Sequence, residues 1–158
     1  MRKQKGFSLI ELLIVVAIIL IIAAIAIPNL LRARIASNES SAVASVRTIN
    51  TAMISYNSSY PSIGYAANLT TLTGTCTGGV VPSSGAACLI DSTLAGGTKS
   101  GYNFSAAGTS GGYAVWANPV TVNTTGVNSF CSVADAVVRE IPGGVAVSTC
   151  AGTETPLQ

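Results

Sequence analysis

The stretch GFSLIELLIVVAIILIIAAIAIPNLL, residues 6–31, decides the fold of this chain. Every residue in the range 12–27 is Leu, Ile, Val or Ala, and two further leucines at 30 and 31 extend the apolar run beyond Pro28. An α-helix rises about 1.5 Å per residue, so residues 12–31 would span about 30 Å, the thickness of a bilayer's hydrocarbon core. The segment is therefore predicted to cross a membrane as a helix.

Basic residues on both sides of this segment predict its orientation. Arg2, Lys3 and Lys5 precede it, whereas only Arg32 and Arg34 follow it closely. The larger positive cluster stays on the cytoplasmic side, so the amino terminus should lie inside and the rest of the chain outside.

Two simpler interpretations of the segment remain to be weighed. A secretory signal would be cleaved after the small residues Ala24-Ile25-Ala26, but the apolar run continues past that point. A plain membrane anchor has no use for Glu11, since an acid in a transmembrane helix costs about 2.5–3.5 kcal/mol at the centre and less near an end. The alternative role for Glu11 is local, because the first turn of a helix favours an acid.

The residues around Glu11 form a pattern that resembles a known targeting signal. A short basic leader ends in Gly6, an aromatic residue follows at Phe7, and Glu11 stands at the fifth position after the glycine. This pattern resembles the class III signal of type IV prepilins and related pseudopilins. The resemblance continues through IPNLLRAR, residues 27–34, and is weak beyond Ser58.

The resemblance implies cleavage by a membrane-embedded prepilin peptidase between Gly6 and Phe7, followed by N-methylation of the new amine on Phe7. The amine of an incoming subunit could then neutralise Glu11 of a subunit already in the bundle, because a low dielectric favours the pairing of opposite charges. Glu11 and Phe7 are therefore the expected assembly determinants.

The helix is expected to continue well beyond the membrane. Ala42, Val46, Ile49, Met53 and Tyr56 recur at steps of four, three, four and three, which predicts one apolar stripe on a helix. The stripe should pack under a sheet.

A single helix is therefore predicted from about Phe7 to Ser58. A kink or local melting is expected near residues 24–29, because Pro28 lacks a backbone N–H and its ring clashes with the preceding turn.

The predicted fold class is α+β, a long amino-terminal helix under a small antiparallel sheet of three to five strands. Four parts are expected: a cleaved leader at 1–6, a transmembrane and filament-core half-helix at 7–31, an amphipathic half-helix at 32–58, and a globular head at 59–158 with an αβ-loop, the sheet and a disulfide-bounded carboxyl-terminal region.

β-Branched and aromatic residues between Gly-rich turns predict the strands of the head, and two earlier stretches predict short helices. The expected strands are residues 101–106, 112–120, 128–134, 136–141 and 145–150, and the expected short helices lie within 69–74 and 88–97. Tyr102, Phe104, Tyr113 and Trp116 should line the face that covers the helix stripe, with an aromatic ligand box as the alternative.

The chain contains four cysteines, Cys76, Cys88, Cys131 and Cys150, and none of them forms a CxxC pair. Behind a membrane-targeting segment they predict two disulfides rather than a zinc site. Sequence proximity favours Cys76 with Cys88 and Cys131 with Cys150, and buried thiols are the alternative.

Composition argues against several other functions. The chain has no histidine, and its few head carboxylates form no recognisable catalytic or metal-binding group, so no enzyme activity, metal or cofactor is predicted. Without the leader, five basic and six acidic side chains remain, a net charge of −1, and no basic field for nucleic acid is visible.

The leading hypothesis is the major pilin of a type IV pilus. Its expected partners are copies of itself, the prepilin peptidase, the assembly platform with its ATPase, and inner-membrane lipid before assembly. The chain would then move to the cell surface, where adhesion, motility, DNA uptake and electron transfer are not distinguished by sequence. The alternatives are a periplasmic major pseudopilin of a type II secretion system and a minor pilin acting as a tip adhesin or DNA receptor.

Overall fold

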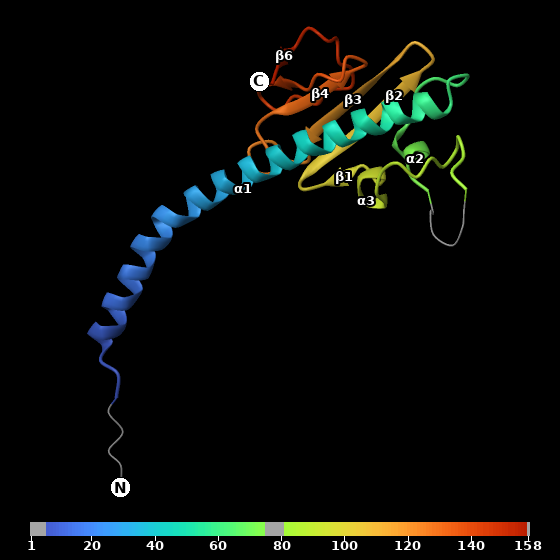
Figure 1. Ribbon diagram of the computed structural model, residues 1–158. Coiled ribbons are helices and arrows are strands. Elements are labelled where there is room, and N and C mark those ends of the chain that lie inside the picture. Colours follow the sequence, from blue (N-terminus) through green and yellow to red (C-terminus); the bar gives the residue numbers. More distant parts are fainter. Residues whose placement is uncertain (1–5, 75–80, 158) are drawn as a thin grey trace. The chain divides into compact units, whose positions relative to one another are not determined.

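A computed structural model describes residues 6–74 and 81–157 of the chain. The chain divides into two compact units that meet between Arg34 and Ile35. Helix α1 (Leu9–Ser59) contributes to both units and is followed by two four-residue helices, α2 (Leu69–Leu72) and α3 (Ser92–Ala95) (Figure 1). The two short helices lie within the stretches predicted to hold them.

The first unit presents apolar side chains that nothing in it covers. In the helix from Leu9 onward, Leu9 is 79% exposed and Ile18 is 52% exposed. Among the described residues, α1 is long and apolar enough to cross a membrane, with a mean hydropathy of 3.3 over its most apolar window. The helical backbone continues through Pro28, so the local melting expected there does not occur, whereas the kink stays a prediction.

The predicted apolar stripe is buried in the second unit. Ala42, Val46, Ile49 and Met53 are fully buried, and Tyr56 is 2% exposed. Three- and four-residue spacing places these side chains on one face of the helix, which packs against the sheet. This burial confirms the interpretation of the stripe as core.

The second unit contains an antiparallel sheet with strands in chain order, β1 to β6 (Figure 1). The strands are β1 (Thr98–Lys99), β2 (Tyr102–Thr109), β3 (Gly112–Pro119), β4 (Ser129–Val133), β5 (Arg139–Ile141) and β6 (Thr155–Pro156). The α+β class is confirmed. The expected count of three to five strands is wrong, because the described part of the chain has six.

The differences in the strands have a simple origin. The edge strands β1 and β6 have two residues each, too few to show an alternating pattern. Residues 145–150 are not a strand, although their composition predicts one. They cover the sheet instead: Asn118 exchanges two hydrogen bonds of 2.9 Å with the backbone of Val147, and Ser129 donates one to the carbonyl of Val145.

The prediction for Trp116 is also wrong. Side chains alternate between the two faces of a strand, and on β3 Tyr113 and Val115 are buried whereas Trp116 is only half-buried. Trp116 pairs with Ser105 and Cys131 in the neighbouring strands, so it lies on the face away from α1. Tyr102, Phe104 and Tyr113 are buried in the core as expected.

Candidate functional site

The start of α1 carries a local hydrogen bond that involves Glu11. The backbone N–H of Ser8 donates to Oε2 of Glu11 at 2.9 Å, and the Ser8 carbonyl accepts from the N–H of Leu12 at 3.2 Å. Ser8 therefore occupies the N-cap position and Glu11 the third helical position, and their bond is one of the two that make up a capping box. The Ser-x-x-Glu spacing of residues 8–11 is a sequence signal for this cap that our sequence analysis missed.

This cap gives Glu11 a role within its own chain. The carboxylate satisfies a backbone N–H that would otherwise have no partner in the first turn, and its charge suits the positive end of the helix dipole. The contact of Glu11 within the described residues is made by Oε2, so Oε1 is available to another donor.

The residues before the cap are accessible. Phe7 is 78% exposed, and both Gly6 and Phe7 precede the first helical residue. Apart from Gly6 and its chain neighbours, no described residue has an atom within 4 Å of the position that a Cβ on Gly6 would occupy. The expected cleavage point is thus in an open, non-helical segment of the chain.

The carboxyl-terminal part of the head is tied to the sheet by a disulfide. Cys131 on β4 pairs with Cys150, 19 residues later, with a Cα–Cα distance of 5.8 Å. Cys88 is disulfide-bonded as well, and Cys76 lies outside the described residues.

Glu154 lies near the disulfide of Cys131, but the arrangement does not fit a metal site. The sulfurs of Cys131 and Cys150 are bonded to each other and are not thiolate ligands. Oε1 of Glu154 accepts the backbone N–H of Ala151 at 2.8 Å, and this bond lowers the pKa of Glu154. Glu154 therefore orders the carboxyl-terminal turn.

An ion pair holds the turn between β4 and β5. Arg139 is 6% exposed, and its guanidinium donates to both carboxylate oxygens of Asp135 and to the Val137 carbonyl. The bonds from Arg139 lower the pKa of Asp135. Asn50 on α1 reaches the same turn, donating to Oγ of Ser132 at 2.9 Å and to the carbonyl of Ala136 at 3.3 Å. These contacts join the helix to the sheet.

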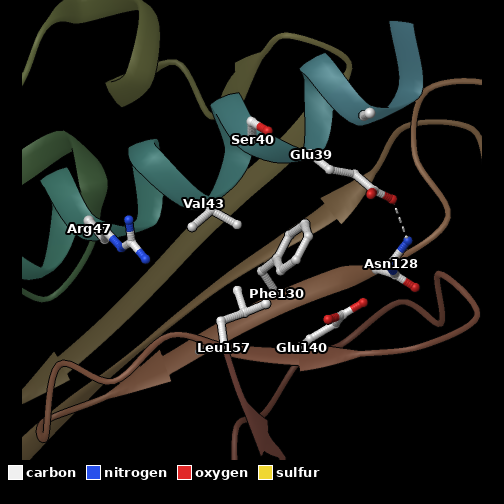
Figure 2. Close-up of a pocket in the computed structure, with 9 residues that line it drawn as sticks. Glu39, Ser40, Val43, Arg47, Asn128, Phe130, Glu140 and Leu157 are labelled. Atoms are coloured by element: carbon white, nitrogen blue, oxygen red, sulfur yellow. Dashed lines mark hydrogen bonds between the residues drawn. The ribbon is translucent and has the colours of Figure 1, made fainter. Parts of the chain in front are cut away.

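A groove in the described head lies beside α1 and has a volume of about 430 Å³. Figure 2 shows apolar side chains between the helix and the sheet, with Glu39 hydrogen-bonded to Asn128. The groove is lined by Ala36, Glu39, Ser40, Val43 and Arg47 of α1 and by Asn128, Phe130, Glu140 and Leu157. We call it the Glu39 groove. Our sequence analysis missed it, because its residues come from segments far apart in the chain.

The amino-terminal segment has recognisable relatives. Residues 1–27 match the family described as the prokaryotic N-terminal methylation motif. The chain is 67% identical over 39 residues to the type IV wide pilus major component PilA4 of Thermus thermophilus, covering 25% of this chain and 30% of the relative. The chain is type IV pilin-like.

Two further relatives agree with this assignment. The pilin-like chain is 48% identical over 54 residues to the type IV major pilin protein PilA of Myxococcus xanthus, covering 34% of this chain and 24% of the relative. It is 38% identical over 65 residues to the type II secretion system core protein G of Vibrio cholerae, covering 39% of this chain and 44% of the relative. The chain spans less than half the length of each of these relatives. No solved structure matches it.

Proposed function

We propose that this pilin-like chain is the structural subunit, the major pilin, of a type IV pilus. The observation that carries the proposal is the methylation motif at residues 1–27, which overlaps the part of α1 whose apolar side chains are exposed. The chain would be inserted in the inner membrane as a prepilin, cleaved after Gly6, methylated on the amine of Phe7 and assembled through α1. It acts as a building unit and not as an enzyme.

Burial of the exposed half of α1 would drive assembly. None of the apolar side chains of residues 9–31 is buried within its own unit. Full burial of one Leu or Ile side chain is worth about 1.5–3 kcal/mol relative to water, so the segment has to lie either in lipid or among other helices. Extraction into a filament replaces lipid contacts with neighbouring copies of the same helix.

The charges at the start of α1 would set the axial position of neighbouring copies. Cleavage before Phe7 creates an ammonium group, and Glu11 retains Oε1 for it while Oε2 caps the helix. We call two neighbours the outer copy and the inner copy, the outer one displaced toward its head. A displacement of four residues, about 6 Å, brings the Phe7 amine of the outer copy level with Glu11 of the inner copy.

This geometry reverses the direction that we expected from the sequence. Subunits enter the filament from the membrane, so the newly added subunit is the inner copy. The incoming subunit therefore supplies Glu11, and the subunit already in the bundle supplies the amine. The opposite assignment would separate the two groups along the axis instead of bringing them level.

The partners and location follow from the same proposal. Prepilin peptidase would act on the open segment at Gly6 and Phe7, and an assembly platform with its ATPase would provide the work of extraction. The precursor would reside in the inner membrane and the assembled chain on the cell surface, where a pilus can serve adhesion or motility.

A major pseudopilin of a type II secretion system is the second candidate. The match to the Vibrio cholerae core protein G covers 44% of that relative, the largest share among the relatives described above. Against it, residues 143–158 contain a single acid, Glu154, whose carboxylate accepts the backbone N–H of Ala151. The Cys131–Cys150 disulfide closes the carboxyl-terminal loop. This arrangement favours the pilin.

Electron microscopy of filaments sheared from cells, with mass spectrometry of their subunit, tests the proposal. We expect long surface filaments whose subunit begins at methylated Phe7. Cells that express a Gly6→Leu variant are the matched control and should retain an uncleaved chain in the membrane. Filaments that lack the chain, or that form only as short periplasmic assemblies, would refute the assignment as a major pilin.

A further inference from the structure

The Glu39 groove has an apolar floor between two ends of opposite charge. Three apolar side chains line the floor in Figure 2: Val43, Phe130 and Leu157. Figure 2 also shows Glu39 and Glu140 toward one side of the view and Arg47 toward the other. Glu39 and Arg47 are eight residues apart on α1, which is about 12 Å along the helix axis. The groove therefore suits a surface that carries both a positive and a negative group.

The charged groups of the groove have unused hydrogen-bonding capacity. Oε1 of Glu39 accepts the backbone N–H groups of Val127 at 2.8 Å and of Asn128 at 3.1 Å, which fixes the carboxylate. Its Oε2 has no partner among the described residues. The side chains of Glu140 and Arg47 form no hydrogen bond or ion pair within residues 6–74 and 81–157. All three charges can therefore take a partner from another molecule.

The two carboxylates act on the same part of the groove. Burial raises the pKa of the Tyr102 hydroxyl, and the negative charges of Glu39 and Glu140 raise it further. That hydroxyl donates to the carbonyl of Asn128 at 2.8 Å, and Asn128 lines the groove. Glu39 and Glu140 thus add their negative potentials at one end, which favours the binding of a cation there.

A cation and an anion lie near each other at the opposite edge of the sheet. Lys99 is on the edge strand β1, and Asp91 is the N-cap residue of α3, which adjoins β1. The hydrogen bond from the backbone N–H of Leu94 is the main cause of the lowered pKa of Asp91, and the charge of Lys99 lowers it as well. Lys99 forms no ion pair in the described part of the chain. This surface therefore carries the two charges that the groove suits.

We propose that the Glu39 groove receives Lys99 of a second copy of this chain, whose ammonium pairs with Glu39 and Glu140 while Asp91 of that copy faces Arg47. The inference rests on the proposed function, which supplies the neighbouring copies. The aliphatic stem of a lysine can pack on the apolar floor while its ammonium donates hydrogen bonds to the carboxylates. The contact lies between two heads and needs no relation between head and membrane segment.

The position of the two surfaces makes this contact repeatable. The groove is lined by residues of β4 and β5 and by Leu157, whereas Lys99 lies on β1 at the other edge of the same sheet. A contact between two different surfaces leaves one of each free on the resulting pair of copies. Such a contact continues from copy to copy instead of closing a dimer, as a filament requires.

Zero-length cross-linking of filaments tests this contact directly. Outside the leader Lys99 is the single lysine of the chain, and a carbodiimide joins an amine to a carboxylate in contact with it. We expect sheared wild-type filaments to give covalent multimers whose linked peptides join Lys99 to Glu39 or Glu140. A link from Lys99 to Asp91 within one copy produces no multimer. Lys99→Arg is the matched control, since it keeps the charge but lacks the amine, and its filaments should give no such link.

An exchange of charges provides the second measurement. Lys99→Glu and Glu140→Lys should each lower the fraction of subunits that stay in filaments after mild heating at low ionic strength by about twofold to fivefold, the range of a partly exposed ion pair. The combined variant restores opposite charges and should recover to within about twofold of wild type. At about 1 M salt, which screens charges beyond about 3 Å, the single variants should match wild type.

The outcomes separate this proposal from the proposed function. Filaments whose subunit begins at methylated Phe7 but that give no multimers linked through Lys99 would overturn the groove contact and leave the pilin assignment intact. A combined variant that is no more stable than Lys99→Glu or Glu140→Lys alone would do the same. A wild-type chain that enters no filament would overturn both proposals.

Discussion

Replacing Glu11 separates its two roles, the cap within its own helix and the charge offered to a neighbour. In Glu11→Gln the side-chain carbonyl can still accept the Ser8 N–H, which lies 2.9 Å from the native carboxylate, but the charge is gone. In Glu11→Ala both are lost. The comparison of the two variants therefore isolates the charge.

The magnitudes of the two losses differ. Loss of a helix cap costs about 0.5–2 kcal/mol and acts on the single subunit. Loss of a hydrogen bond to a charged group costs about 1.5–3 kcal/mol and acts on each contact between subunits. Glu11→Gln should consequently lower the ratio of assembled to membrane-held subunits by about tenfold to a hundredfold. Glu11→Ala should lower it somewhat further.

The assay compares the subunit in sheared filaments with the subunit in the membrane fraction by immunoblotting. Mass spectrometry of the amino terminus verifies that the peptidase still cleaves before Phe7 in each variant. Ser8→Ala is the control, since it retains both the Glu11 charge and the backbone N–H to which Glu11 is bonded, and it should assemble within about threefold of wild type. Normal assembly of a correctly cleaved Glu11→Gln chain would refute the reasoning.

Three further predictions concern the head. Ile49→Ala, at a fully buried position, should destabilise the detergent-solubilised chain by about 2–5 kcal/mol in denaturant titrations, whereas a loss below about 1 kcal/mol would contradict the core assignment. Cys150→Ser opens a disulfide that spans 19 residues and should cost about 3 kcal/mol in the same titration, with an unchanged midpoint as the contrary result. The hydrogen bond from Arg139 is the main cause of the lowered pKa of Asp135. The contribution of Asp135 to the free energy of unfolding is therefore fully present above the unfolded pKa of about 3.9 and is lost as the pH falls through the lower folded pKa. Asp135→Asn should remove this pH-dependent part of the stability, which is about 1 kcal/mol or less because the carboxylate is 43% exposed. An unaltered dependence of stability on pH below about pH 4 would contradict a stabilising role of the Asp135–Arg139 ion pair.

The long helix was predictable because its two signals are dense and local. The apolar run at 12–27 needs no context to be recognised, and the stripe from Ala42 to Tyr56 repeats at helical spacing over about four turns. The start of the helix was predicted two residues too early, at Phe7. The Ser8–Glu11 cap explains the difference, since an N-cap residue is itself outside the helix.

The sheet was less predictable, because the burial of its residues depends on partners remote in sequence. Trp116 is a large aromatic residue of a type expected in a core, yet strand alternation places it on the opposite face from Tyr113 and Val115. Residues 145–150 are rich in valine and resemble a strand, but their hydrogen bonds go to side chains of the sheet. A β-rich composition alone does not distinguish a strand from a segment that covers one.

The distribution of exposed apolar surface links these observations to assembly. In the second unit the apolar stripe on α1 is covered by the chain's own sheet, so its side chains are buried without a second subunit. In the first unit more than half of the surface of Leu20 and of Ile22 on the same helix is exposed. Contact of this apolar surface with water is energetically unfavourable. Nothing within this unit covers that surface, and the proposed function assigns its burial to lipid and then to other copies. Apolar contacts alone specify neither an axial position nor a partner. A lone acid in the apolar half, Glu11, is a feature that can specify both under the proposed function.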